Sequence, residues 1–167
     1  MSKLTELVYP TYTGRFITEN DREWLDECLA PNYYFPLDDA FIDPPDEDAT
    51  IYPVSRVWET NTSTPNRVMW TFILFDLEAS TNTVKGLAVH PDYRNQGVWN
   101  TWKKEASKYW LTNGSTNFNV KVENSPNANP YWANRDSSSP WKRLYTQEGV
   151  IVENAERPDL EKWVETL

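Results

Sequence analysis

Cysteine and histidine are almost absent from this chain of 167 residues, which contains one of each, Cys28 and His90. A single cysteine excludes an internal disulfide. One cysteine and one histidine are also too few for a structural zinc site, which draws its whole ligand set from these residue types. We therefore expect neither a disulfide nor a bound metal.

Long apolar runs are absent as well. No segment approaches the roughly 18 residues that a membrane-spanning helix needs. Residues 1–6 also lack the apolar core of a secretory signal. These absences predict a soluble, cytoplasmic protein that has no membrane partner.

Basic residues are scarce relative to acidic ones, since 16 Lys and Arg against 25 Asp and Glu give a formal net charge of -9. An acidic surface repels nucleic-acid phosphates, so no nucleic-acid partner is expected. The charge suits a cationic partner such as a lysine side chain or a polyamine, or it serves solubility alone. Acidic residues gather in the proline-rich segment 31–49, which is predicted to be a loop, at Asp38, Asp39, Asp43, Asp46, Glu47 and Asp48.

Aromatic residues are abundant: nine Trp, nine Tyr and six Phe supply large apolar faces for a core. The chain has the usual length of one domain, and it contains no internal repeat or long low-complexity tract. We interpret residues 1–167 as a single domain.

Alternating apolar residues predict strands at 8–16, 51–59, 68–77, 84–90, 118–122 and 150–152. Apolar residues three or four apart predict helices that begin after Thr18 and at 98–111, and short helices are expected at 141–147 and 158–167. Short connections favour antiparallel pairing, whereas a helix between strands 84–90 and 118–122 favours a parallel crossover. The expected class is α+β, with a mostly antiparallel mixed sheet flanked by helices.

The segment 86–99 carries the chemical signal. An apolar strand is followed by a polar turn with one glycine, Gly97, and then at once by a helix. The first N–H groups of a helix lack internal acceptors and carry partial positive charge, which suits a phosphate or pyrophosphate. Gly97 lets the backbone approach closely, and Arg94 adds a fixed charge. A purely structural turn is the plain alternative.

This segment resembles the central motif of the GNAT superfamily of N-acetyltransferases, in which an apolar strand is followed by Pro-x-Tyr-Arg and a glycine-containing turn that opens a helix. The resemblance is tight over about 25 residues and extends as element order over most of the chain. The matching residues are Leu87, Ala88, Val89, Pro91, Tyr93, Arg94, Gln96 and Gly97.

The resemblance implies an acetyl-CoA site at this junction. The amides of Asn95, Gln96, Gly97, Val98 and Trp99 would hold the pyrophosphate, with Arg94 beside them. The strand residues Leu87, Ala88 and Val89 would offer backbone groups to the pantetheine arm, in a slot opened where strand 118–122 diverges.

One residue departs from the motif. The family has Gly or Ala where this chain has Trp99. The large ring either points at the phosphates, which would weaken cofactor binding, or turns into the core with Trp102. The sequence leaves both orientations open.

Candidates for catalysis follow from the same resemblance, which implies a tyrosine that protonates the leaving thiolate. Tyr145 is our candidate, because the segment 144–150 matches best, and Tyr131 is the alternative. Asn124 is expected beside the cofactor. A backbone N–H near Val89 would serve the oxyanion, and the general base is not identified.

We therefore predict an enzyme that transfers an acetyl group from acetyl-CoA to a primary amine, on a small molecule or on a protein lysine or N-terminus. The acidic loop 38–48 and the N-terminal helix would form the acceptor site. The alternative is a catalytically inactive GNAT-like protein that acts by binding or inhibiting another protein. Glu123, Asp76 and His90 remain weak candidates for the base, and the oligomeric state stays open.

Overall fold

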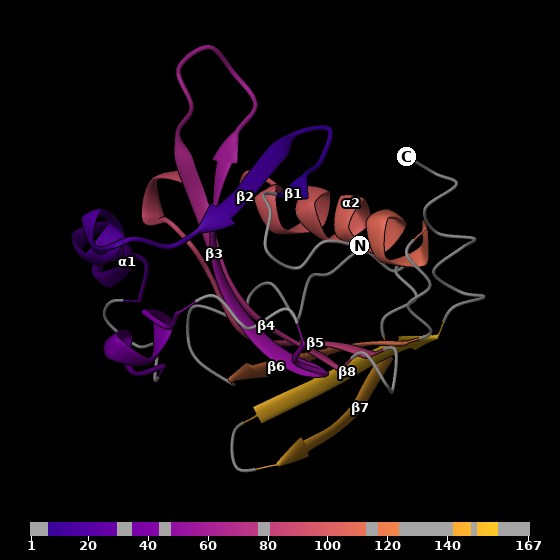
Figure 1. Cartoon of the computed structure of the whole chain (residues 1–167). Helices are drawn as coiled ribbons and strands as arrows, with labels where there is room; N and C mark the ends of the chain where they lie inside the picture. The colour runs from indigo at the N-terminus through magenta and orange to yellow at the C-terminus, as the bar shows by residue number, and fades with distance from the viewer. Residues whose placement is uncertain are drawn as a thin grey trace.

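The computed structural model describes residues 7–29, 35–43, 48–76, 81–112, 117–123, 142–147 and 150–156. Within these residues one sheet has the strand order β1-β2-β3-β4-β5-β6-β8-β7 (Figure 1). Its strands are β1 (Leu7–Val8), β2 (Tyr12–Phe16), β3 (Ile51–Thr60), β4 (Arg67–Asp76), β5 (Thr81–Val89), β6 (Asn117–Glu123), β7 (Lys142–Gln147) and β8 (Val150–Glu156). The helical elements are η1 (Glu19–Asp21), α1 (Arg22–Leu29), η2 (Leu37–Ala40), η3 (Pro91–Tyr93) and α2 (Val98–Thr112).

Neighbouring strands pair antiparallel throughout this sheet, with one exception. β5 and β6 run parallel, and α2 forms the crossover between them. The predicted class, a mostly antiparallel mixed sheet flanked by helices, is confirmed. The helix expected at 98–111 is α2.

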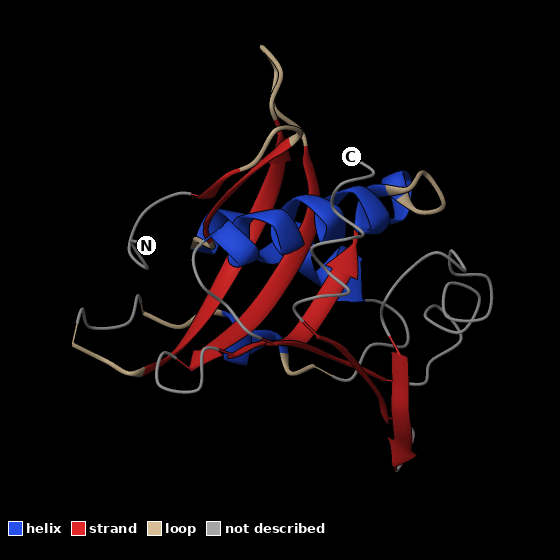
Figure 2. Ribbon diagram, turned by 90° about the vertical axis from the view of Figure 1, so that its right-hand side faces the viewer, coloured by secondary structure: helices blue, strands red, loops and turns tan. Residues whose placement is uncertain are grey.

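The two helices bury apolar residues against opposite faces of the sheet (Figure 2). Successive strand side chains point to opposite faces, so neighbouring residues on β3 enter different clusters. Val57 packs with α1, whereas Trp58 packs with α2. Each face is centred on a buried indole whose N–H donates to a hydroxyl on the adjoining strand: Trp58 to Thr71 Oγ1 at 2.9 Å and Trp70 to Ser55 Oγ at 2.7 Å.

The two ends of the chain differ from the sequence prediction. Residues 8–16 form two short strands, because Tyr9 N donates to Tyr12 O at 2.8 Å and closes a tight turn that contains Pro10. The helix predicted at 141–147 is wrong, since Lys142–Gln147 is strand β7. A two-residue connection lets β7 and β8 pair as a hairpin, which satisfies more backbone groups than an isolated short helix. The helix predicted at 158–167 lies outside the described residues.

An irregularity in β5 separates it from β6. Phe72 pairs with Gly86 and Ile73 with Val84, so Lys85 is an extra residue between two regular pairs. Such a bulge bends a strand and increases its local twist. The parallel pairing of β5 with β6 ends at Val84 and Val120, although β5 continues to Val89 and β6 to Glu123. The last residues of the two strands therefore diverge, as the sequence predicted.

None of the described helices is long and apolar enough to cross a lipid bilayer.

Candidate functional site

The far half of β5 presents its backbone edge in the opening beside β6. Ala88 is buried against α1, while Leu87 and Val89 pack on the side of α2. Both rows of side chains are therefore used in the core. What remains toward β6 is the main chain of the strand, which is the geometry that an extended ligand can use.

The turn from β5 into α2 exposes main-chain donors. The backbone is left-handed at Asn95 (φ 63°) and at Gly97 (φ 77°). The first helical hydrogen bond runs from Thr101 N to Gly97 O at 3.0 Å, so the N–H groups before Thr101 lie outside the backbone ladder of α2. Among the described residues, the amides of Asn95, Gln96 and Gly97 have no hydrogen-bond acceptor.

Gly97 leaves open space at this turn. A Cβ atom built on Gly97 would meet nothing within 4 Å, and the residue is exposed. The helix dipole and the outward amides make the place suitable for an anion.

No protein-family model matches the sequence, and no curated protein matches it either. Solved structures match over nearly the whole chain. A chimera of the spermidine N-acetyltransferase SpeG from Vibrio cholerae and hSSAT has a TM-score of 0.65 at 12% identity, covering 91% of this chain and 99% of that chain. The ribosomal-protein-S18-alanine N-acetyltransferase from Escherichia coli has a TM-score of 0.51 at 16% identity, covering 87% and 93%. An uncharacterised protein from Bacillus halodurans has a TM-score of 0.67 at 13% identity, covering 98% and 96%.

The chain has the fold of the GNAT acetyltransferases. Identities this low establish the fold alone. The residues that carry the sequence motif form the strand end, turn and helix start described above.

Trp99 turns its ring away from this turn. Its side chain is 6% exposed and belongs to the core cluster beneath α2. The ring stacks on Trp102, with centroids 5.4 Å apart and planes 17° apart, and Lys103 Nζ lies 5.4 Å from its centroid. Of the two orientations left open by the sequence, the structure has the one in the core, so a bulky residue is accommodated at this position of a GNAT fold.

Arg94 is held by main-chain carbonyl groups. Its Nε donates to Val89 O at 3.0 Å, and its Nη2 donates to Cys28 O at 2.9 Å. The guanidinium thus ties the last turn of α1 to the end of β5. The expected contact of Arg94 with phosphate stays a prediction, and this structural contact was not foreseen.

His90, the residue after β5, is also tied to α1. Its side chain is 10% exposed, and Nε2 lies 2.8 Å from Glu27 Oε2. Nδ1 accepts a hydrogen bond from Asp92 N at 3.1 Å and so caps η3. Trp24 stacks on the ring at a centroid distance of 5.9 Å. Glu27 was missed by sequence reasoning, since the contact spans 63 residues.

The catalytic candidates are placed only by their backbone. Tyr145 lies on β7 and pairs with Val152 of β8. β7 is the edge strand of the sheet, beyond β8 and β6. Adjacent strands are about 4.8 Å apart, so the Tyr145 main chain lies roughly two strand spacings from β6. Asn124 and Tyr131 lie outside the described residues. The structure therefore does not bring Tyr145 and the motif residues into one described cluster.

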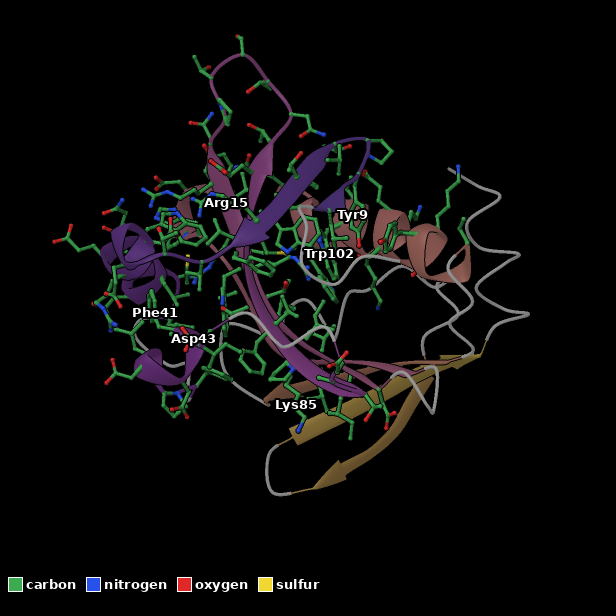
Figure 3. All side chains as sticks on the ribbon, in the orientation of Figure 1. Tyr9, Arg15, Phe41, Asp43, Lys85 and Trp102 are labelled. Carbon is green, nitrogen blue, oxygen red and sulfur yellow. The ribbon has the colours of Figure 1, made fainter. Side chains whose placement is uncertain are left out.

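The acceptor-side candidates lie beside α1. Phe41 and Asp43 follow η2, next to α1 in Figure 3. Arg22 pairs with Asp38 at 2.8 Å and lies over the Phe41 ring at 4.1 Å. Asp39 and Asp43 are exposed. Asp38 of the acidic loop thus already pairs with a cation from α1, whereas Asp39, Asp43 and Asp48 face solvent.

A cleft of about 690 Å³ lies between η1, α1, the start of β4 and η3. A network of charges lines it, in which Arg15 and Arg67 both bind Asp21 at distances of 2.8 to 3.1 Å. His90 and Glu27 line it too. In the part of the chain that the structure describes, no group of three or more His, Cys, Asp or Glu side chains is placed to hold a metal.

Proposed function

We propose that this protein transfers an acetyl group from acetyl-CoA to a primary amine. One observation carries the proposal: in a GNAT fold, β5 and β6 diverge beyond Val84 and Val120 and the open strand leads directly into the exposed Gly97 turn. An elongated ligand with a diphosphate at one end and a thioester at the other matches a slot that ends in outward amides.

The residues of the turn fit the diphosphate. Anions are favoured where N–H groups at a helix start lack protein acceptors, as at Asn95 and Gly97. The open space at Gly97 lets a phosphate oxygen approach the main chain. The ring of Trp99 packs in the core, so it does not fill this space. We assign the diphosphate contacts to the amides of residues 95–99, with Arg94 holding the turn against α1.

The strand edge fits the pantetheine arm. Side chains of Leu87, Ala88 and Val89 all point into the two core clusters, and the amides and carbonyls between them are the groups that an extended chain can pair with. Asn124, which follows β6 in the sequence, is assigned to the same ligand from the family resemblance alone.

Acetyl-CoA supplies the activated acyl group. The residues of this chain must then accept a proton from the amine, stabilise the oxyanion and protonate the leaving sulfur. Backbone N–H donation near Val89 would serve the oxyanion. We assign the acid to Tyr145, with Tyr131 as the alternative. Among the weak candidates for the base, Glu123 is the last residue of the diverging strand β6. Asp76 is the last residue of β4 and pairs with Thr81, the first residue of β5, so it lies at the end of β5 away from the turn.

A cationic amine is the proposed acceptor class. Asp39 and Asp43 are exposed beside α1, and the formal net charge is -9. Spermidine is the substrate named for one of the similar structures, and a polycation of that kind matches this charge. A protein lysine or N-terminus has the same reacting group and remains within the proposal.

The alternative is an inactive GNAT-like binding protein. It rested on Trp99, on the long stretch before Tyr145 and on an aromatic-rich surface. The stretch 124–141 lies outside the described residues, and the other two features can be compared with the structure. The Trp99 ring is in the core, and the large hydrophobic residues found exposed in the described part of the chain are Val8 and Ile51, neither of them aromatic.

Calorimetric titration with acetyl-CoA tests the proposal directly. We expect binding, followed by release of free thiol when spermidine, a lysine peptide or an N-terminal peptide is added. Binding with no transfer to any amine would favour the inactive alternative, and no binding would refute the cofactor assignment.

Replacing Tyr145 by Phe tests the acid. Turnover should fall about 100-fold or more, which is the usual contribution of a positioned acid, while the acetyl-CoA dissociation constant should stay within about twofold because the hydroxyl is assigned no ground-state contact. Tyr131→Phe is the matched comparison. If only Tyr131→Phe loses turnover, the acid is Tyr131.

A further inference from the structure

The first turn of the proposed cofactor loop depends on an imidazole. His90 follows β5 directly, and its Nδ1 accepts the N–H of Asp92 at 3.1 Å, which caps η3. η3 leads into the loop 94–97. The conformation at the start of this loop is therefore fixed by a side chain whose hydrogen bonds are made with Glu27 and Asp92.

These contacts settle the tautomer of the ring. A nitrogen that accepts an N–H cannot carry a proton. The proton of neutral His90 is therefore on Nε2, which donates to Glu27 Oε2 at 2.8 Å. Stacking on Trp24, with planes 8° apart, fixes the orientation of the ring.

Arg94 makes a second link between the same two parts of the molecule. It bridges Val89 O and Cys28 O, and Cys28 is the neighbour of Glu27 on α1. The beginning and the end of η3 are thus both held to the last turn of α1.

We propose that His90 is a positioning residue for acetyl-CoA binding, because its neutral Nε2–H form holds the loop 94–97 in the conformation that receives the diphosphate. The inference rests on the function proposed above. His90 acts through the loop and makes no contact with the ligand.

Protonation of His90 would break this arrangement. A proton on Nδ1 meets the Asp92 N–H, so the cap is lost. The Asp92 carboxylate, with Oδ2 3.7 Å from Nδ1, then competes for the same nitrogen. Two further charged side chains lie near the ring. Glu27 of α1 faces Nε2, and Arg67 of β4 lies over Trp24, 5.4 Å from the centroid of that ring, where it pairs with Asp21.

Three variants separate the two contacts of the ring. In His90→Asn, the amide oxygen can still accept the Asp92 N–H, as Asn does at helix caps, but the side chain cannot titrate. His90→Leu removes both contacts. Glu27→Ala removes the acceptor of Nε2–H, and Glu23→Ala, on an exposed residue one turn earlier in α1, is its matched control.

The experiment measures the acetyl-CoA dissociation constant by calorimetry for each variant at pH 8 and pH 5.5. We expect His90→Leu to bind about fivefold more weakly than wild type at pH 8, the size of effect of one lost cap hydrogen bond. His90→Asn should bind within about twofold of wild type at pH 8, because it keeps that bond. Between pH 8 and 5.5 wild type should weaken about fivefold more than His90→Asn, since the ligand phosphate titrates equally in both.

Equal pH dependence of wild type and His90→Asn would overturn the proposal, as would wild-type affinity in folded His90→Leu. If His90→Leu fails to fold, the difference in pH dependence between wild type and His90→Asn still tests the proposal. A wild-type protein that binds no acetyl-CoA at either pH would refute the proposed function, and the role of His90 with it. Because His90 is the one histidine of the chain, its imidazole NMR signals report its titration without ambiguity.

Discussion

The turn from β2 into α1 and the turn from β5 into α2 face the same local requirement, and they meet it differently. At each, a strand leads through a 3-10 turn into a helix whose first N–H groups need an acceptor. In the first turn the chain supplies the acceptor itself: Asp21 Oδ2 accepts from Thr18 N at 2.9 Å. In the second, His90 Nδ1 caps the 3-10 turn by accepting from Asp92 N, but the amides of Asn95 and Gly97, just before α2, have no acceptor among the described residues.

The two turns also differ in how deeply their residues are buried. Asp21 is 1% exposed and is surrounded by Arg15 and Arg67, whereas residues 95–97 are exposed. The comparison teaches that N–H groups before a helix stabilise the fold where a side chain accepts their hydrogen bonds. Where no side chain accepts them, the same groups can bind a ligand.

We call the turn at residues 18–21 the closed turn and the turn at residues 95–97 the open turn. The largest expected effect comes from a substitution in the closed turn. Asp21→Asn leaves two arginines around a neutral amide and should lower the free energy of unfolding by about 3 kcal/mol, as for other buried ion pairs that lose one partner. Chemical denaturation measures this. Glu19→Gln removes an exposed carboxylate of the same turn, and its denaturation midpoint should hardly move. A wild-type midpoint for Asp21→Asn would mean that the closed turn contributes no stability.

Filling the open turn should act on the ligand. Gly97→Val places a branched side chain at φ 77° and in the space proposed for the phosphates. We expect acetyl-CoA to bind at least about tenfold more weakly, or roughly 1.4 kcal/mol, with an added cost in stability from the left-handed backbone. Asn95→Gly relieves the other left-handed residue, and it should leave both quantities near wild type. Unchanged affinity in Gly97→Val would show that the diphosphate binds elsewhere.

The closed turn should also make stability depend on acid. Burial would raise the pKa of Asp21, but hydrogen bonds from Arg15, Thr18 N and Arg67 outweigh it and hold that pKa below its ordinary value. The carboxylate therefore stabilises the fold above about pH 4, and this stabilisation is lost as the pH falls through the lowered folded-state pKa. Thermal unfolding from pH 5 to pH 2 should show a slope of at most about 1.4 kcal/mol per pH unit from this group. A slope undiminished in Asp21→Asn would assign the effect to other carboxylates.

The smallest effect is expected at the rim of the open turn. Gln96 Nε2 donates to Asp92 O at 2.9 Å on the surface. Gln96→Ala removes this bond and should weaken acetyl-CoA binding about twofold, since exposed hydrogen bonds contribute little. A loss of tenfold would mean that the Gln96 side chain contacts the ligand.

Much of this contrast could be predicted from local sequence. The period of the apolar residues located α2 and the central strands, and Gly97 after an apolar strand located the open turn. Tertiary contacts were beyond such patterns. Lys103 and Glu105 are charged residues of α2, yet both are buried. Glu105 is covered by the β1–β2 turn, where Thr11 N donates to its Oε1 at 2.7 Å.

The candidate site shows the same limit. The motif predicted which backbone turns toward a ligand, but the orientation of the Trp99 ring depended on Trp102 and its neighbours. The contacts of His90 with Glu27 and of Arg94 with Cys28 O join residues more than sixty positions apart, and no periodicity encodes them. For residues 141–147 the prediction failed, because the pairing partner β8 decided the outcome, and local helix propensity did not.

The single extra residue at Lys85 has a consequence for how this chain tolerates changes of length. Because side chains alternate along a strand, removing one residue from a regularly paired stretch exchanges the two sides of the strand beyond it. Removing Lys85 would not, because Val84 and Gly86 already pair with the consecutive residues Ile73 and Phe72. Leu87 and Val89 would stay on the side of α2 and Ala88 on the side of α1, so a deletion at Lys85 should keep the packing and remove the bend. The exposed segment 61–66 between β3 and β4 is not a strand, so no alternation of side chains is disturbed there and insertions should be tolerated.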